Sequence, residues 1–273
     1  MTKSTLTTSA CANHTPSHGW TGAIASLRQE KGLWVAIAII TLWMVSTIGL
    51  FSLNFATLAL PWRGLAFLWQ VFLYTGLFVT AHDAMHGSVT PAHRRWNDAI
   101  GTLALWLYGL FDYTYMRQQH QKHHAQPAQK GDPDYHAPHS SSFLAWYGNF
   151  MGSYWSWLRL GLLISSFHAV HQIFQISEAN LSWFWVFPAI TSSLQLFFFG
   201  TYLPHREPRA GYTNDHRSQS TDLPVFWSFL TCYHFGYHEE HHALPHLAWW
   251  QLPQVRGGRG RGGEGEKEGC IPL

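Results

Sequence analysis

The chain has 273 residues, of which 47% are hydrophobic and only 12% are charged, whereas soluble globular domains usually carry about 25% charged residues. This deficit argues against an ordinary soluble protein, and a formal net charge of +2 without a basic stripe argues against a nucleic-acid partner. The three cysteines are far apart in sequence and form no CxxC pair, so they indicate neither a disulfide framework nor a thiolate zinc site.

Two long apolar segments follow a polar stretch, residues 1–30, which we expect to be a disordered tail. Residues 33–53 contain no charge and are long enough to cross a bilayer core, which takes about 20 apolar residues. Residues 64–81 form the second run, and a short proline-containing segment, residues 58–63, joins the two. The pattern predicts a transmembrane helical hairpin.

Three shorter or more aromatic segments come next. Residues 99–111 number about 13, too few to span a bilayer, and we expect an interfacial or re-entrant helix there. Residues 143–164 and 181–203 are candidate spans, rich in aromatic side chains, which favour the membrane interface. The sequence therefore predicts an all-α integral membrane protein with about four transmembrane helices plus an interfacial helix.

Lysine and arginine are concentrated in the segments that flank clusters of histidine and are scarce in the two connections on the opposite side. The positive-inside rule then places both termini and a histidine-rich cap on the cytoplasmic side. We expect one catalytic domain, residues 31–255, followed by a C-terminal tail, residues 256–273. The Gly, Arg and Glu composition of that tail is typical of disorder.

Histidine is abundant, with 19 residues, and eight of them occur in three clusters with helical spacing. The clusters are His82 and His86 (HxxxH), His120, His123 and His124 (HxxHH), and His238, His241 and His242 (HxxHH). Residues three and four apart share one face of a helix, so each cluster should project its imidazoles in one direction. Eight such ligands suffice for two metal ions. Neutral imidazole binds Zn, Cu, Fe or Ni, and the ligand type alone does not select among them.

The clusters lie at the ends of apolar runs or beyond them. A divalent-metal transporter, the alternative of a different class, needs ionisable ligands near the bilayer midplane. The position of the histidines therefore favours an enzyme that acts on a lipid-soluble substrate at the membrane boundary.

The histidine series resembles that of the membrane fatty-acid desaturase and hydroxylase superfamily, and the words around it resemble bacterial and cyanobacterial β-carotene ketolases. These words are FLYTGLFVTAHDAMHG (72–87), GDPDY (131–135), FFFGTYLPHR (197–206), GYTNDH (211–216) and FWSFLTCYHFGYHEEHH (226–242). The resemblance covers roughly residues 33–255. It does not extend to the C-terminal tail.

The resemblance implies two iron ions, dioxygen as co-substrate and reduced ferredoxin as electron donor. Two successive hydroxylations at C4 of a β-ionone ring, followed by loss of water, would convert β-carotene or a related carotenoid into echinenone and canthaxanthin. A carotenoid hydroxylase or a fatty-acyl desaturase on the same scaffold is the alternative. It would share the metal ligands and differ in the shape of the substrate tunnel.

Related di-iron enzymes use one further histidine between the second and third clusters, and His216 is the first choice for it. His234, four residues before His238, is the main competitor, and His205 at the end of an apolar run comes next. Metal-bound imidazoles usually donate their second N–H to a carboxylate or a carbonyl. Carboxylates placed to accept it are Asp83, Asp132, Asp134, Asp215, Glu239 and Glu240. Asp83 ranks first because it lies between a membrane helix end and two ligands.

Overall fold

The computed structural model describes residues 31–136, 142–208 and 210–262, and every regular element in these ranges is helical. Three helices in the described residues are long and apolar enough to cross a membrane: α2 (Lys31–Phe51), α3 (Leu60–Met85) and the continuous run Glu178–His205. They correspond to the predicted spans at 33–53, 64–81 and 181–203. Large apolar side chains on their outer faces are exposed, among them Trp34 and Ile48 of α2, as expected for a surface that faces lipid.

The third of these helices contains two wider, π-helical turns. It consists of α8 (Glu178–Leu181), η1 (Ser182–Val186), α9 (Phe187–Phe197), η2 (Phe198–Tyr202) and α10 (Leu203–His205). Each π turn is followed by a proline, Pro188 or Pro204. Proline lacks an N–H and its ring clashes with the carbonyl one turn earlier, so a widened turn before it relieves that clash. These turns set the rotation of His205 at the end of the helix.

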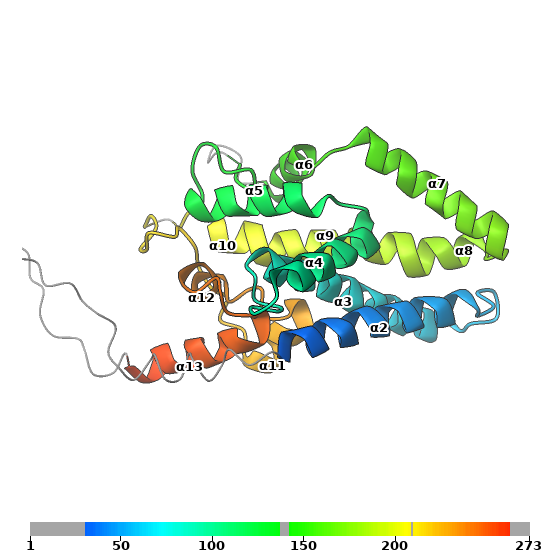
Figure 1. Cartoon of the computed structure of the whole chain (residues 1–273), viewed down its shortest axis with the longest axis horizontal. Helices are drawn as coiled ribbons and strands as arrows, with labels where there is room; N and C mark the ends of the chain where they lie inside the picture. Colours follow the sequence, from blue (N-terminus) through cyan, green and yellow to red (C-terminus); the bar gives the residue numbers. More distant parts are fainter. Residues whose placement is uncertain (1–30, 137–141, 209, 263–273) are drawn as a thin grey trace, which may run out of the picture.

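The predicted span at residues 143–164 does not form one helix. It is divided into α6 (Phe143–Ser153) and α7 (Trp157–Phe174), which run in different directions in Figure 1. Ser156 begins α7 by accepting a hydrogen bond from the N–H of Arg159, and the Arg159 guanidinium donates to the Tyr154 carbonyl oxygen at 2.8 Å. The prediction was wrong because this polar break interrupts the apolar run. Neither α6 nor α7 has the length and hydropathy of the three helices above.

Two helices lie between the first hairpin and α6 in the chain, and both pack against α3. They are α4 (Arg94–Gly109), which contains most of the apolar segment at 99–111, and α5 (Tyr113–Ala125), which contains the HxxHH word. Gly101 of α4 has no room for a side chain, because a Cβ there would lie 2.3 Å from Cε2 of Tyr113. This close approach holds α5 against α4, and both contact α3.

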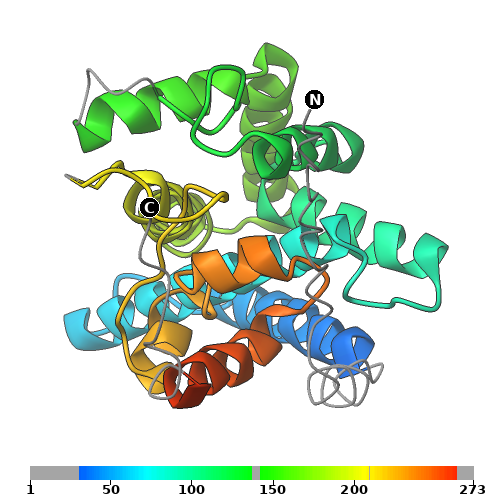
Figure 2. The same cartoon turned by 90° about the vertical axis from the view of Figure 1, so that its left-hand side faces the viewer.

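The C-terminal segments lie on the other side of the α9–α10 helix from α6 and α7 (Figures 1 and 2). They are α11 (Val225–Cys232), α12 (His238–Ala243), η3 (Trp249–Gln251) and α13 (Leu252–Gly262). Because α13 extends to Gly262, the predicted start of a disordered tail at residue 256 lies inside a helix. The predicted N-terminal tail, residues 1–30, and residues 263–273 of the predicted C-terminal tail (256–273) lie outside the described residues.

Candidate metal centre

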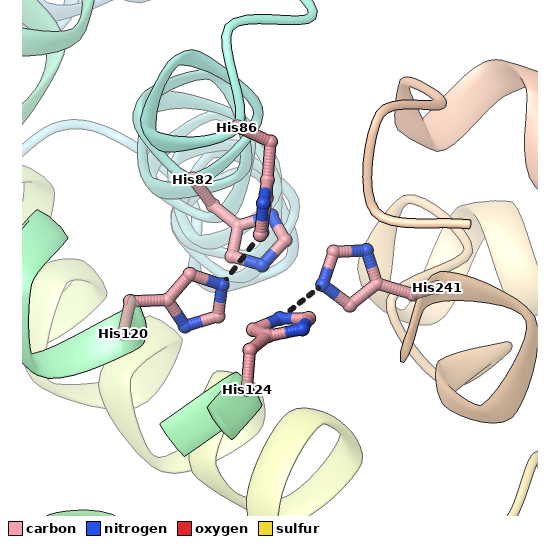
Figure 3. Close-up of side chains that lie close together, drawn as sticks. All are labelled: His82, His86, His120, His124 and His241. Atoms are coloured by element: carbon pink, nitrogen blue, oxygen red, sulfur yellow. Dashed lines mark hydrogen bonds between the residues drawn. The ribbon is translucent and has the colours of Figure 1, made fainter. Parts of the chain in front are cut away.

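Nine histidines of the described chain form two groups in which the donor nitrogens lie within 4.8 Å of one another. The five-histidine group consists of His82, His86, His120, His124 and His241, and the four-histidine group of His123, His205, His238 and His242. Figure 3 shows the first group, with rings from α3, α5 and α12 turned toward a common centre. The two groups adjoin, since the rings of His124 and His242 stack with centroids 4.1 Å apart.

The prediction that each cluster projects its imidazoles in one direction was wrong for the two HxxHH clusters, because the histidines of each are divided between the two groups. Residues i and i+4 differ by about 40° around a helix, whereas i+3 and i+4 differ by about 100°. His120 and His124 of α5 therefore join the five-histidine group together, while His123 turns to the four-histidine group. In α12 the pair His238 and His242 joins the second group and His241 the first.

The distances between donor atoms fit a pair of metal ions. Neighbouring Nε2 atoms are 2.8 Å apart in His86–His120, 3.0 Å in His124–His241 and His205–His238, 3.1 Å in His238–His242 and 3.2 Å in His123–His242. Ligands at right angles around an ion, with metal–nitrogen bonds of about 2.1 Å, would be about 3.0 Å apart. The Nε2 of His82 is buried without a hydrogen-bond partner among the described residues, which is costly unless the atom binds something else.

Two histidines of the four-histidine group have their Nδ1 atoms held by hydrogen bonds. Nδ1 of His123 lies 3.0 Å from both carboxylate oxygens of Asp132, which also accepts the N–H groups of Ala128 and Asp134. Nδ1 of His205 donates to the carbonyl oxygen of Arg217 at 2.9 Å. Such contacts place the ring proton on Nδ1 and leave Nε2 free to bind a metal.

Burial keeps most of these imidazoles neutral, which is the form that binds metals. It lowers the pKa of His86 to about 4, and the pKa values of His124 and His241 fall well below the usual range for the same reason, with neighbouring histidines adding to the effect. Burial also acts to lower the pKa of His123, but the hydrogen bond to Asp132 and the charge of Asp134 raise it overall.

The histidine expected to complete the set differs from the first choice made from the sequence. The structure places His205, not His216, in the four-histidine group. His205 is held at the end of a long helix, whereas His216 lies in the loop after it, and its ring centroid is 6.0 Å from that of His242. His234 does not share a helical face with His238, because Tyr233 and His234 have positive φ angles and α12 begins only at His238.

The predicted carboxylates have different partners. Asp83 lies beside His82, with 3.5 Å between Oδ1 and Nδ1, but its hydrogen bond comes from the N–H of Trp249. Asp134 Oδ2 is 3.9 Å from Nδ1 of His123. Of the remaining three residues, Glu240 binds Ser220 and Arg256, Asp215 lines a surface pocket, and the backbone N–H of Glu239 donates to the Ser220 hydroxyl. The hydrogen bond between His205 and the Arg217 carbonyl oxygen could not be predicted from the sequence.

A mainly apolar cavity extends from the histidines into the helical bundle. Two histidines of each group border it: His82 and His120 of the first, His123 and His238 of the second. Its other walls come chiefly from α3, α4, α6 and the α9–η2 segment, and include Phe78, Tyr108, Phe111, Phe150, Met151, Leu196, Phe197, Thr201 and Phe235. An elongated apolar molecule could place one end beside both metal positions.

Comparison with known proteins identifies the family. The fatty acid desaturase family model matches residues 58–182 and 154–259. A β-carotene ketolase of Paracoccus sp. (strain PC1) is 39% identical over 230 residues, which cover 84% of this chain and 89% of that protein.

Two algal relatives extend the comparison. A β-carotene ketolase of Haematococcus lacustris is 42% identical over 200 residues, 70% of this chain and 61% of that protein. A zeaxanthin 4-ketolase of Chlamydomonas reinhardtii is 36% identical over 241 residues, 86% of this chain and 53% of that protein. The chain therefore belongs to the fatty acid desaturase family and, within it, to the membrane-bound β-carotene ketolases.

Proposed function

We propose that this chain is a β-carotene 4-ketolase that uses dioxygen to introduce keto groups at C4 and C4′ of β-ionone rings, giving echinenone and canthaxanthin. The observation that carries the proposal is an apolar cavity bordered by ligands of both histidine groups, in a chain similar to named ketolases over most of its length. A carotenoid is an apolar rod with a ring at each end, which suits such a cavity.

Each histidine group would hold one iron ion. Zinc also accepts imidazole ligands but has no redox chemistry, whereas oxygenation of an aliphatic carbon by dioxygen requires electrons to pass through the centre. When bound, the two irons would supply the activation of dioxygen with electrons from reduced ferredoxin. Asp132 and the Arg217 carbonyl would hold His123 and His205 in the tautomer that the irons require.

The protein itself would position the substrate ring and exclude water from the cavity. The cavity walls are largely aromatic and aliphatic side chains, which would surround the apolar ring. The Phe235 ring meets His82 edge to face with centroids 4.7 Å apart. A Cβ on Gly200 would lie 2.0 Å from Cε1 of that ring. The absence of a side chain at Gly200 therefore allows Phe235 to lie beside His82 of the five-histidine group.

The overall reaction balances as two oxygenations and one dehydration. Each oxygenation would consume one dioxygen, two electrons and two protons, insert one oxygen atom into a C4–H bond to give a hydroxyl, and release the other oxygen atom as water. The second would give a geminal diol at the same carbon. Loss of water from that diol yields the ketone without a further oxidant.

The three apolar helices place the protein in a membrane, where the carotenoid is dissolved. We propose that the histidine end of the bundle faces the cytoplasm, because lysine and arginine are concentrated around the histidine clusters. A soluble ferredoxin could then approach the metal centre from that side. The histidine groups lie at the ends of α3 and α10 rather than half-way along them, which does not suit the alternative of a metal transporter.

Expression in a bacterium that produces β-carotene tests the proposal. The unmodified chain should yield 4-keto products by chromatography, His124→Ala should yield none, and His168→Ala on the outward-facing helix α7 should resemble the unmodified chain. Hydroxylated products without ketones would favour a carotenoid hydroxylase, and altered fatty acids a desaturase. Unchanged β-carotene with well-expressed, iron-loaded protein would contradict the proposal.

A further inference from the structure

Thr201 is a buried polar residue in the wall of the apolar cavity. Its side chain is 8% exposed and lies in η2, four residues before the metal-centre histidine His205. No hydrogen bond to its hydroxyl is found in the part of the chain that the structure describes. By contrast, the cavity residue Ser193 pairs with Tyr147 at 3.1 Å, and the cavity residue Tyr154 donates to Asp134.

The π-helical turn explains why this hydroxyl has no partner within its own helix. Threonine in a helix commonly donates to the carbonyl oxygen four residues earlier. Thr75, Thr102 and Thr231 of this chain do so at 2.7 to 2.9 Å. In the wider turn η2 the Thr201 hydroxyl makes no such bond. Thr201 borders the mainly apolar cavity, and a hydroxyl there without a protein partner is stabilised when a ligand in the cavity supplies one.

The substrate acquires that partner only during the reaction. β-Carotene is a hydrocarbon and offers no hydrogen-bonding group. After one oxygenation the ring carries a hydroxyl on C4, and this half-oxidised ring must stay in the cavity for the second oxygenation at the same carbon. Thr201 lines the same cavity as His123 and His238, so a ring whose C4 is oxidised beside these histidines would lie in the cavity that the Thr201 side chain borders.

We propose that Thr201 is a substrate-binding residue whose hydroxyl hydrogen-bonds the C4 hydroxyl of the half-oxidised ring and retains it until the second oxygenation. This inference rests on the proposed ketolase function. It identifies a residue, distinct from the metal ligands, that would set the ratio of 4-hydroxy product to ketone. Thr201→Val has nearly the same shape as threonine and lacks the hydroxyl, whereas Thr201→Ser keeps the hydroxyl. Thr102→Val is a matched control, because Thr102 lies on α4 and donates to its own helix.

The test uses full-length protein in membranes, supplied with ferredoxin, its reductase and either β-carotene or 4-hydroxy-β-carotene. Thr201→Val should raise the ratio of 4-hydroxy product to ketone about five- to tenfold, and should raise the KM for 4-hydroxy-β-carotene relative to that for β-carotene by a similar factor, as expected for one lost hydrogen bond. Thr201→Ser and Thr102→Val should keep the ratio of the unmodified chain at equal iron content.

An unchanged ratio in Thr201→Val, with ketone still formed by the unmodified chain, would overturn this inference and leave the ketolase proposal standing. Failure of the unmodified chain to form any ketone would instead refute the ketolase proposal and this inference with it. If Thr201→Val does not accumulate as folded protein, Thr201→Ala removes the same hydroxyl without adding a methyl group.

Discussion

Replacing Asp132 with Asn should weaken metal binding in the four-histidine group selectively. The Asp132 side chain is buried, both of its oxygens lie 3.0 Å from Nδ1 of His123, and they also accept the N–H groups of Ala128 and Asp134. Asparagine has one acceptor oxygen and no charge, so at least one of these three donors loses its partner. Loss of an outer partner of a metal-bound histidine typically costs 10- to 100-fold in affinity, or about 1.4 to 2.8 kcal/mol.

Asp215→Asn provides a matched control, because Asp215 also lies near the histidine clusters in sequence but lines a surface pocket. Both variants and the unmodified chain would be purified in detergent and titrated with a competing iron chelator, with iron per chain measured by elemental analysis. We expect Asp132→Asn to fall from two irons toward one at a chelator concentration at which the other two proteins retain both. Equal losses in the two variants, or no loss in Asp132→Asn, would refute the assignment of Asp132 to His123.

Three further predictions follow from the geometry. His205→Ala should lower the iron content from two toward one ion per chain, whereas His216→Ala should leave it unchanged; the reverse order would contradict the membership of the four-histidine group. Gly200→Ala should destabilise the fold by about 1 to 3 kcal/mol, since its Cβ would overlap the Phe235 ring, and an unaltered thermal unfolding midpoint would count against that contact. Arg256→Ala should speed hydrogen exchange in α12, because it removes a cation 3.3 Å from a buried carboxylate of that helix; unchanged exchange would show that the pair is dispensable.

Local sequence determined which residues can act as ligands and on which elements they lie. The HxxxH and HxxHH spacings follow the period of an α-helix, so the three clusters could be assigned to helices without knowledge of the fold. The long apolar runs predicted four membrane helices, of which three are present in the described residues, because length and hydropathy are properties of each segment alone. The words around the clusters were specific enough to indicate the family, which the comparisons confirmed.

The grouping of the ligands was decided only by tertiary structure. Whether His123 or His124 faces a given metal position depends on how α5 packs between α3, α10 and α12, and no local pattern contains that information. The same holds for His205, which joins the four-histidine group because the π turns and Pro204 rotate the end of its helix toward α12. The break at Tyr154–Ser156 and the π turn that contains Thr201 were local features that the sequence analysis did not recognise, since they involve contacts within about five residues. Only the packing of α3, α5, α10 and α12 against one another brings the nine histidines into two groups, because these segments are distant in sequence.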